Sequence, residues 1–312
     1  MSDILQQCIS DYQVWSPISA SKAQQARRVF PGGDTRMSAH YPPYPLFMER
    51  GEGARMIDAD GHELIDFMNN FTALIHGHAN PQIVEAVQSQ IARGSAFAAP
   101  TDNQIELGEL IRTRVPSVEQ LRFTASGTEA TLMAIRCARA FTGRNKIMKM
   151  EGGYHGSYEM AEVSLVPHPK HSGSLSAPVA VPIDNSHSES MFEDVVVCPY
   201  NEPEAARGLI RMHAEDLAAI IIEPVQGSMG MVAATAEFLQ LLREESEQAG
   251  ILLIFDEVIT LRNGFGGMQQ SLGITPDLTA MGKIIGGGLP VGAIGGREDL
   301  LRVFHPDERR PV

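Results

Sequence analysis

Two residues far apart in the sequence, Asp256 and Lys283, have the chemistry of a covalent cofactor site. Asp256 follows the apolar run 251–255, and Lys283 precedes the glycine cluster 286–288. Such a run predicts a strand buried on both faces of a parallel sheet, and ligands bind at the carboxyl ends of such strands. A lysine among apolar residues and glycines can be desolvated, which lowers its pKa and makes it nucleophilic. The pair suits pyridoxal phosphate, because the lysine forms a Schiff base with the cofactor aldehyde and the acid keeps the pyridine nitrogen protonated.

Each of the two residues also has an ordinary structural explanation. An aspartate that ends a core strand often only caps a turn or a helix, and a lysine near glycines is usually solvated. The apolar run with Asp256 and Glu257 is also typical of P-loop nucleotidases. Those enzymes require a GxxxxGK[ST] loop, which the sequence lacks, and no GxGxxG follows a predicted strand. The cofactor interpretation therefore depends on the residues that join the pair.

The composition is that of an ordinary globular protein with an acidic surface. The chain has 312 residues, of which 43% are hydrophobic, and a formal net charge of -13. This charge argues against nucleic acid as a partner, since binding it requires clustered lysine and arginine, and equally against anionic membrane surfaces. It is compatible with a small anionic ligand that a few local donors hold.

Cysteine usage and apolar patterning predict a cytoplasmic protein. The three cysteines, Cys8, Cys137 and Cys198, are scattered and have no CxxC spacing, so neither a disulfide framework nor a zinc site is expected. The first residues do not have the pattern of a signal peptide, and no apolar run approaches membrane-spanning length.

From about residue 121 onward, strands and helices alternate, which predicts an α/β domain with a mostly parallel sheet. The expected strands are 121–123, 146–150, 195–197, 218–222 and 251–255, and the expected helices are 128–141, 205–213 and 236–249. Before this region, the sequence predicts partial helix over 3–29, a hairpin at Asp60-Gly61 and a helix over 83–93. The stretch 167–190 is rich in Pro, Ser, His and Gly and is expected to be a long ordered loop or lid.

Small and hydroxylic residues lie where the strand 121–123 gives way to a helix. Ser126, Gly127 and Thr128 would expose backbone N–H groups at the positive end of that helix, which suits a phosphate. An ordinary N-cap is the alternative and the commoner case.

Four further residues lie in positions where they could contact a cofactor ring. Tyr154 and His155 follow two glycines after a predicted strand, and the tyrosine could lie flat on the ring. Glu223 is a second acid at a strand end. Val258 would point to the same side as Asp256 and could pack on the opposite face of the ring. The alternatives are a buried turn tyrosine, a capping acid and an ordinary core valine.

Two other patterns suggest ligand contacts. Arg36 follows a glycine turn and could present its guanidinium to a carboxylate, although a surface arginine is the simpler explanation. His76 and His78 could suggest a metal, but a third ligand is lacking in the sequence, and no metal site is expected.

Five motifs in order resemble the class III aminotransferases of PLP fold type I. They are Ser-Gly-Thr-Glu-Ala (126–130), Tyr-His-Gly (154–156), Glu-Pro-Val-Gln-Gly (223–227), Phe-Asp-Glu-Val (255–258) and Lys-Ile-Ile-Gly-Gly-Gly-Leu-Pro-Val-Gly-Ala (283–293). The resemblance implies a mostly parallel seven-stranded sheet with helices on both faces and a small α+β domain that is only partly present. Residues 1–50 would belong to the small domain and residues 51–312 to the large PLP-binding domain. The family's C-terminal small-domain segment is expected to be absent from this chain.

The resemblance also implies a role for each site residue. Lys283 would carry the cofactor as a Schiff base and shuttle a proton, and Asp256 would bind the pyridine nitrogen. The remaining cofactor contacts would be phosphate binding by Ser126, Gly127 and Thr128, ring stacking by Tyr154 within the Tyr154-His155 motif, packing by Val258, and support of the ring hydroxyl side by Glu223. Arg36 would bind the substrate carboxylate.

Within the class, two branches fit the sequence. The Pro-Gly-Gly and Gly-Gly-Tyr-His-Gly stretches resemble glutamate-1-semialdehyde aminomutases, whereas Gly-Gly-Asp-Thr-Arg (32–36) is closer to β-amino-acid (β-phenylalanine type) transaminases. The predicted function is transfer of an amino group from a carboxylate-bearing, β-type amino acid to a 2-oxo acid by a homodimer. The alternatives are the intramolecular aminomutase and a truncated, inactive PLP-fold binding protein.

Overall fold

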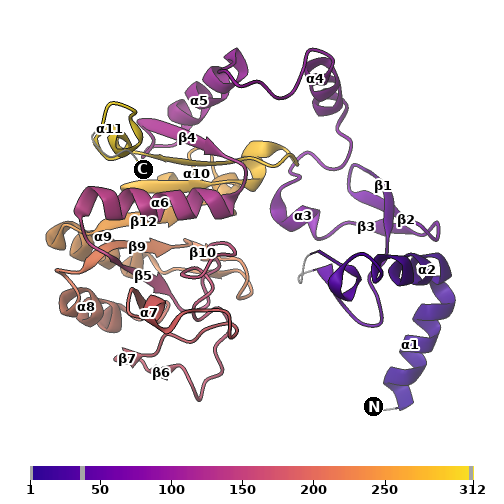
Figure 1. Ribbon diagram of the computed structural model, residues 1–312, viewed down its shortest axis with the longest axis horizontal. Helices are drawn as coiled ribbons and strands as arrows, with labels where there is room; N and C mark the ends of the chain where they lie inside the picture. The colour runs from indigo at the N-terminus through magenta and orange to yellow at the C-terminus, as the bar shows by residue number, and fades with distance from the viewer. Residues whose placement is uncertain (1–2, 36–38, 309–311) are drawn as a thin grey trace. The chain divides into compact units, whose positions relative to one another are not determined.

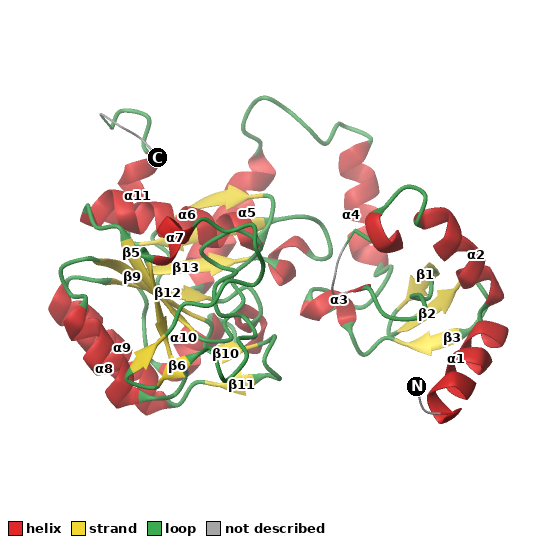
Figure 2. Ribbon diagram, turned by 60° about the horizontal axis from the view of Figure 1, so that its bottom comes forward, coloured by secondary structure: helices red, strands yellow, loops and turns green. Residues whose placement is uncertain are grey.

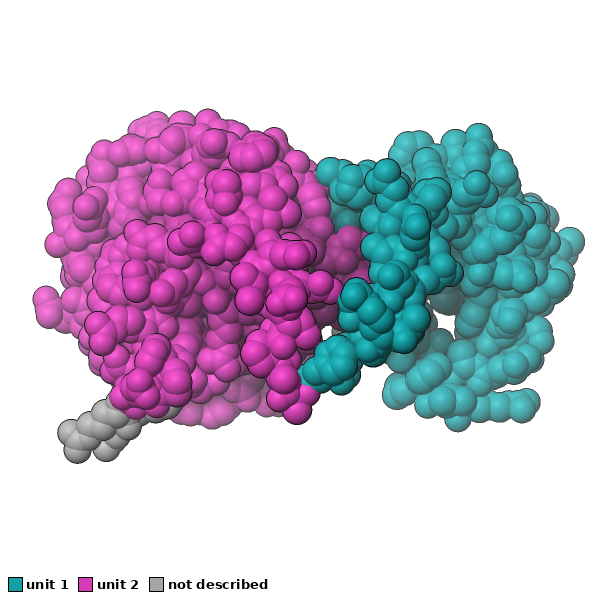
Figure 3. Space-filling view, turned by 90° about the horizontal axis from the view of Figure 1, so that it is seen from above, with its two compact units in different colours: residues 1–97 teal, residues 98–312 magenta. Residues whose placement is uncertain are grey.

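The computed structural model describes residues 3–35, 39–308 and 312. The chain divides into two compact units, residues 1–97 and 98–312, which Figure 3 distinguishes by colour. The domain division between residues 50 and 51 stays a prediction. Among the described residues, none of the helices combines the length and the apolar character that crossing a membrane requires.

The first unit holds short helices and a three-stranded antiparallel sheet of order β1-β2-β3. Its elements are α1 (Asp3–Trp15), α2 (Pro17–Ala26), η1 (Pro31–Gly33), β1 (Met48–Glu52), β2 (Arg55–Asp58), β3 (Glu63–Ile65), α3 (Asn69–Thr72) and α4 (Pro81–Ile91). The predicted hairpin at Asp60-Gly61 joins β2 to β3. Helix α4 begins two residues before the predicted start at residue 83, because Asn80 caps it and Pro81 occupies its first turn.

The second unit contains a seven-stranded sheet of order β4-β14-β13-β12-β9-β5-β8 (Figure 1). The strands are β4 (Gln120–Thr124), β5 (Lys146–Met150), β8 (Val195–Cys198), β9 (Leu217–Ile222), β12 (Leu252–Asp256), β13 (Leu278–Met281) and β14 (Gly292–Gly296). All neighbours pair in parallel except β14, which is antiparallel to both β13 and β4. The predicted α/β architecture with a mostly parallel sheet is therefore confirmed.

Helices cover both faces of this sheet, as the red and yellow elements of Figure 2 show. They are α5 (Asp102–Arg114), α6 (Gly127–Thr142), α7 (Glu189–Phe192), α8 (Pro203–Met212), α9 (Ala236–Ala249), α10 (Gly267–Leu272) and α11 (Glu298–Leu301), with the short turns η3 (Thr260–Asn263), η4 (Lys283–Gly286) and η5 (Arg302–Phe304). Helices α8 and α9 share one apolar core with the sheet, whereas α6 and α11 share the other.

Side-chain alternation decides which face each strand residue serves. On β12, Leu253 and Phe255 belong to the core under α8 and α9, whereas Leu252 and Ile254 belong to the core under α6. Because strand side chains alternate with a period of two, Asp256 falls on the α6 face. The end of β12 thus presents its acid toward the start of α6.

Capping explains why the helices that border the site begin and end where they do. The Ser126 side chain accepts a hydrogen bond from Glu129 N at the start of α6, and Gly143 ends that helix in the left-handed conformation. Thr235 and Gly250 do the same for α9, whose bounds match the predicted helix.

The predicted long loop over 167–190 contains little regular structure. It holds a two-stranded ribbon of β6 (Gly173–Ser174) and β7 (Ala177–Pro178) and runs into α7. A second ribbon pairs β10 (Val225–Gln226) with β11 (Val232–Ala233) directly after Glu223.

Candidate active site

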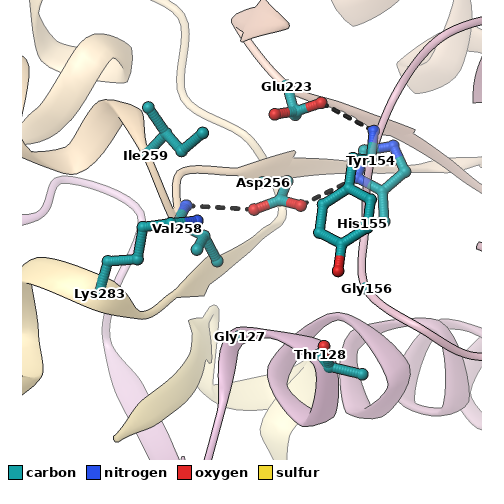
Figure 4. Close-up of a pocket in the computed structure, with 10 residues that line it drawn as sticks. All are labelled: Gly127, Thr128, Tyr154, His155, Gly156, Glu223, Asp256, Val258, Ile259 and Lys283. Carbon is teal, nitrogen blue, oxygen red and sulfur yellow. Dashed lines mark hydrogen bonds and ion pairs between the residues drawn. The ribbon is translucent and has the colours of Figure 1, made fainter. Parts of the chain in front are cut away.

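Segments that follow five strands of the sheet meet at one cavity of about 180 Å³. Its walls come from the start of α6, the loop after β5, the end of β9, the end of β12 and the residue that opens η4 (Figure 4). The lining residues are Gly127, Thr128, Tyr154, His155, Gly156, Glu223, Asp256, Val258, Ile259 and Lys283. The cavity therefore lies at the carboxyl edge of parallel strands, where α/β sheets bind ligands.

Asp256 lies in the middle of this constellation and is almost fully buried (Figure 4). Its Oδ2 is 2.9 Å from His155 Nδ1, and its Oδ1 accepts a hydrogen bond from Val258 N at 3.1 Å. Burial lowers the pKa of His155, although the charge of Asp256 opposes that shift. A neutral His155 that donates through Nδ1 orients the carboxylate of Asp256.

Lys283 is the first residue after β13 and Gly282. Its backbone is left-handed, with φ of +45°, which is rare for a residue with a side chain. Burial lowers the pKa of its amine, and the charges of Asp256 and Glu223 partly offset the shift. An amine with a lowered pKa spends more time deprotonated near neutral pH, which is the state that a nucleophile requires.

Glu223 joins the loop after β5 to the end of β9. Its Oε2 accepts from Tyr154 N at 2.9 Å and its Oε1 from Gly227 N at 3.3 Å. Burial raises the pKa of Glu223, and the nearby charge of Asp256 raises it further. The carboxylate thereby fixes the backbone of Tyr154, whose ring is 43% exposed and borders the cavity.

The start of α6 lines the cavity, and at two glycines there the neighbouring atoms leave no room for a side chain. A Cβ on Gly127 would lie 2.8 Å from Val258 Cγ2, and a Cβ on Gly156 would lie 2.6 Å from Thr128 Oγ1. Both positions therefore require glycine. The first turn of this 16-residue helix presents backbone N–H groups and the positive end of the helix dipole, which together suit an anion.

The structure brings together eight of the ten residues that the sequence predicts for the site. Ser126 serves as the N-cap of α6 and lies outside the set of residues that line the cavity. Arg36 lies outside the described residues. Ile259 and Gly156 line the cavity without having been predicted as site residues. The signal for Ile259 was present, because it extends the apolar sequence after Asp256 and Glu257.

The two histidines considered for a metal have an ordinary place in the first unit. His78 Nε2 is 2.7 Å from Asp66 Oδ2. Over the described residues, no group of three or more His, Cys, Asp or Glu side chains has an arrangement that could hold a metal ion.

Comparison with known proteins decides the family. The family model Aminotransferase class-III matches residues 36–311. The chain belongs to the class III aminotransferases. An ω-transaminase structure from Sphaerobacter thermophilus is 52% identical, with a TM-score of 0.91 and coverage of 94% of this chain and 67% of that one. The fold is therefore that of the PLP-dependent transferases of fold type I.

Two further similar proteins represent the two branches of the family. A structure of a β-phenylalanine aminotransferase from Variovorax paradoxus is 38% identical, with a TM-score of 0.86, over 99% of this chain and 66% of that one. A glutamate-1-semialdehyde 2,1-aminomutase from Thermodesulfovibrio yellowstonii is 42% identical over 91% of this chain and 66% of its own length. The chain thus spans about two-thirds of the length of the curated relatives that it matches.

The family's cofactor is pyridoxal phosphate, and the cavity fits it in three respects. An amine with a lowered pKa and a buried carboxylate both line the cavity. The start of α6 offers a floor that Gly127 and Gly156 leave free of side chains. A partly exposed aromatic ring borders the opening. These are the donor types that such cofactor sites combine.

Proposed function

We propose that this chain carries the active site of a PLP-dependent aminotransferase. The observation that carries the proposal is the meeting of Lys283 and Asp256, 27 positions apart in the sequence, at one cavity with Gly127 and Thr128. The cofactor is the family's, and an amine, an acid and a helix start are the three groups that it requires.

Each residue has a proposed role in this site. Lys283 Nζ holds the cofactor covalently and moves the proton at the reacting carbon, which its lowered pKa favours. Asp256 stabilises positive charge on the pyridine nitrogen, and His155 keeps its carboxylate oriented. Gly127 and Thr128, with Ser126 as the cap, receive the phosphate.

The ring itself would lie between two walls. Tyr154 stacks on one face and Val258 packs on the other, and Glu223 supports the side of the ring hydroxyl while fixing the Tyr154 backbone. When bound, the cofactor supplies an electron sink that stabilises carbanion character at the substrate carbon. The protein's own contribution is to exclude water, orient the amine and hold the charges.

The proposed substrate is a carboxylate-bearing β-amino acid, with a 2-oxo acid as the amino acceptor. Arg36 in Gly-Gly-Asp-Thr-Arg would bind the donor carboxylate. The similarity to the Variovorax paradoxus enzyme supports this branch. The second candidate is glutamate-1-semialdehyde aminomutase, which the similarity to curated aminomutases supports about equally well.

Assembly and location belong to the same proposal. A homodimer follows from the family resemblance, and the cytoplasm from three cysteines that are all free thiols. The alternative of an inactive PLP-fold binding protein stays a prediction, which the experiment below addresses.

The test is the absorbance spectrum of the protein with PLP, before and after addition of β-phenylalanine and then 2-oxoglutarate. We expect a visible band that bleaches with the amine and recovers with the oxo acid, and that Lys283→Ala abolishes. A Lys283-dependent band that only glutamate-1-semialdehyde changes would select the aminomutase. Absence of any band would overturn the proposal and favour the inactive binding protein.

A further inference from the structure

A lysine that the proposed mechanism does not use lies buried in the sheet next to the site. Lys149 is the fourth residue of β5 and has no exposed surface. It pairs with Val197 of β8 on one side and with Ile221 of β9 on the other. Full burial of a lysine is rare unless a counter-charge is near, so this position requires an explanation.

Strand alternation puts Lys149 on the same face as the two acids of the site. Ile147 on β5, Ile221 on β9 and Ile254 on β12 all belong to the core under α6. Two positions further along each strand come Lys149, Glu223 and Asp256. The three charged side chains therefore lie on one face of three neighbouring strands, between the sheet and α6.

Lys149 also holds the loop that carries Tyr154 and His155. Its Nζ donates a short hydrogen bond to the carbonyl of Val163. One residue further on, the carbonyl of Ser164 accepts from Gly152 N at 2.8 Å. The loop thus leaves the sheet after β5, forms one wall of the cavity, and returns directly over the lysine.

Two hydrogen bonds favour the ionised form of Glu223, because both of its oxygens accept from backbone N–H groups. Burial opposes ionisation of both partners, since it raises the pKa of Glu223 to about 8 and lowers that of Lys149 to about 7. The attraction of Glu223 and Glu151 for the ammonium opposes the shift of Lys149.

Few other charges face Lys149. Glu151 follows β5 directly, and His155 of the next loop is hydrogen-bonded to Asp256. On the neighbouring strand β8, the residue that pairs with Lys149 is Val197, which is apolar. The charge of Glu223 acts on Lys149, which stays in place if Lys283 is bound to a cofactor.

We propose that Lys149 is a positioning residue of the cofactor site, whose ammonium balances the buried carboxylate of Glu223 and fixes the loop of Tyr154 and His155 on the sheet. This inference rests on the proposed function for its catalytic meaning. The proposed charge balance does not depend on the cofactor, because removal of one buried partner leaves the charge of the other unpaired.

The experiment is a double-mutant cycle in the cofactor-free protein, with Lys149→Met, Glu223→Gln and the double variant. Urea unfolding midpoints are measured at about pH 7.5, between the pKa values of about 7 for Lys149 and about 8 for Glu223, and at about pH 10. At the lower pH we expect Lys149→Met to lower the midpoint, and the double variant to recover a large part of the loss. At the higher pH the coupling should shrink, because Lys149 loses its proton.

A matched control comes from the same strand. Lys146 is partly exposed, and its Nζ is 3.7 Å from Asp216 Oδ2. The cycle of Lys146→Met and Asp216→Asn should show little coupling at either pH, since exposed ion pairs contribute little.

Cofactor binding gives the second measurement. We expect Lys149→Met to raise the dissociation constant for PLP roughly tenfold. The variant lacks the hydrogen bond that fixes the loop and the positive charge that balances Glu223. If wild type binds no PLP while the cycle still shows coupling, the proposed function fails and the charge balance stands.

Two results would overturn the inference. The first is simple additivity of the Lys149 and Glu223 effects at both pH values, which indicates packing alone. The second is a Lys149→Met protein that does not fold and that Glu223→Gln fails to rescue. Folding of the double variant where the single variant fails would support it.

Discussion

The two ends of the central strands use the same kinds of charged side chain in opposite ways. At the amino end, Asp277 precedes β13 and is fully paired. Its Oδ2 accepts from Arg243 at 2.9 Å and from Leu253 N at 2.8 Å, and its Oδ1 accepts from Arg297 at 2.8 Å. A cavity of about 360 Å³ also opens there, lined by these charged residues.

At the carboxyl end, the charged side chains are fixed by hydrogen bonds, but they have fewer ion pairs than Asp277 has. Asp256 is fixed by His155 and by a backbone N–H, and the Nε2 atom of His155 is buried without a hydrogen-bond partner among the described residues. Glu223 and Lys283 both have shifted pKa values with burial as the first cause. Fully paired charges stabilise a fold, whereas incompletely paired charges with shifted pKa values are available for binding and catalysis.

The largest difference between the two ends should appear with Asp256→Asn. The variant keeps the shape of the side chain but loses the charge that would stabilise a protonated pyridine ring. We expect the transamination rate to fall by roughly 10²–10³-fold, and the free energy of unfolding to stay the same or rise, because repulsion with Glu223 is relieved. Steady-state kinetics and urea unfolding measure the two effects; a rate near that of wild type would contradict the role of Asp256.

Asp277→Ala should have the opposite profile. Its removal takes the carboxylate away from the guanidinium of Arg243, whose side chain is 18% exposed, and leaves the N–H of Leu253 without its acceptor. We expect a loss of about 2–4 kcal/mol in the free energy of unfolding, toward the lower end because Arg297 is partly exposed. The absorbance spectrum of the PLP complex should stay that of wild type. A changed spectrum at unchanged stability would show that the two ends are not separate in function.

A pH titration should sharpen the comparison through His155. Burial lowers its pKa in the folded protein, so the unfolded chain binds the extra proton first as pH falls. Its stabilising contribution is present above the ordinary value of about 6.5 and is lost as pH falls below it, by at most about 1.4 kcal/mol per pH unit. Urea unfolding of wild type and His155→Asn between about pH 8 and 5 measures this, and equal slopes would contradict it.

The smallest effect should come from the outer part of the amino-end cluster. Arg297 also forms an ion pair with Asp299 at 2.8 Å, but both side chains are about half exposed. Asp299→Ala should therefore cost less than about 1 kcal/mol in thermal or urea unfolding. A loss as large as that of Asp277→Ala would mean that exposure does not separate these pairs.

Much of the fold was predictable because local patterns and tertiary packing agree. The run 218–222 is apolar enough to identify an inner strand, and 236–249 carries a cap at each end. The motif residues fall at strand ends, so their convergence follows from the parallel topology. A resemblance built on five motifs then supplied the number of strands in the sheet, but not their order.

Other features could not be predicted from local sequence. Strand β14 has the sequence Gly-Ala-Ile-Gly-Gly, which has low strand propensity. Its glycines are required by close neighbours, since a Cβ on Gly295 would lie 2.7 Å from Val118 and one on Gly296 would lie 2.6 Å from the Asp277 carbonyl. The contact of His155 with Asp256 joins residues 101 positions apart, and no periodicity encodes it. Lys149 was missed because a lysine inside a strand has no evident role until its neighbours in the fold are known.

The left-handed backbone of Lys283 has a consequence for engineering. A non-glycine residue in that conformation costs about 1–2 kcal/mol, and its desolvated amine adds to the cost. Glycine at position 283 would relieve both. A library screened only for thermal resistance would therefore favour loss of the residue on which turnover depends, and a stabilised catalyst has to be selected for cofactor capture and melting temperature together.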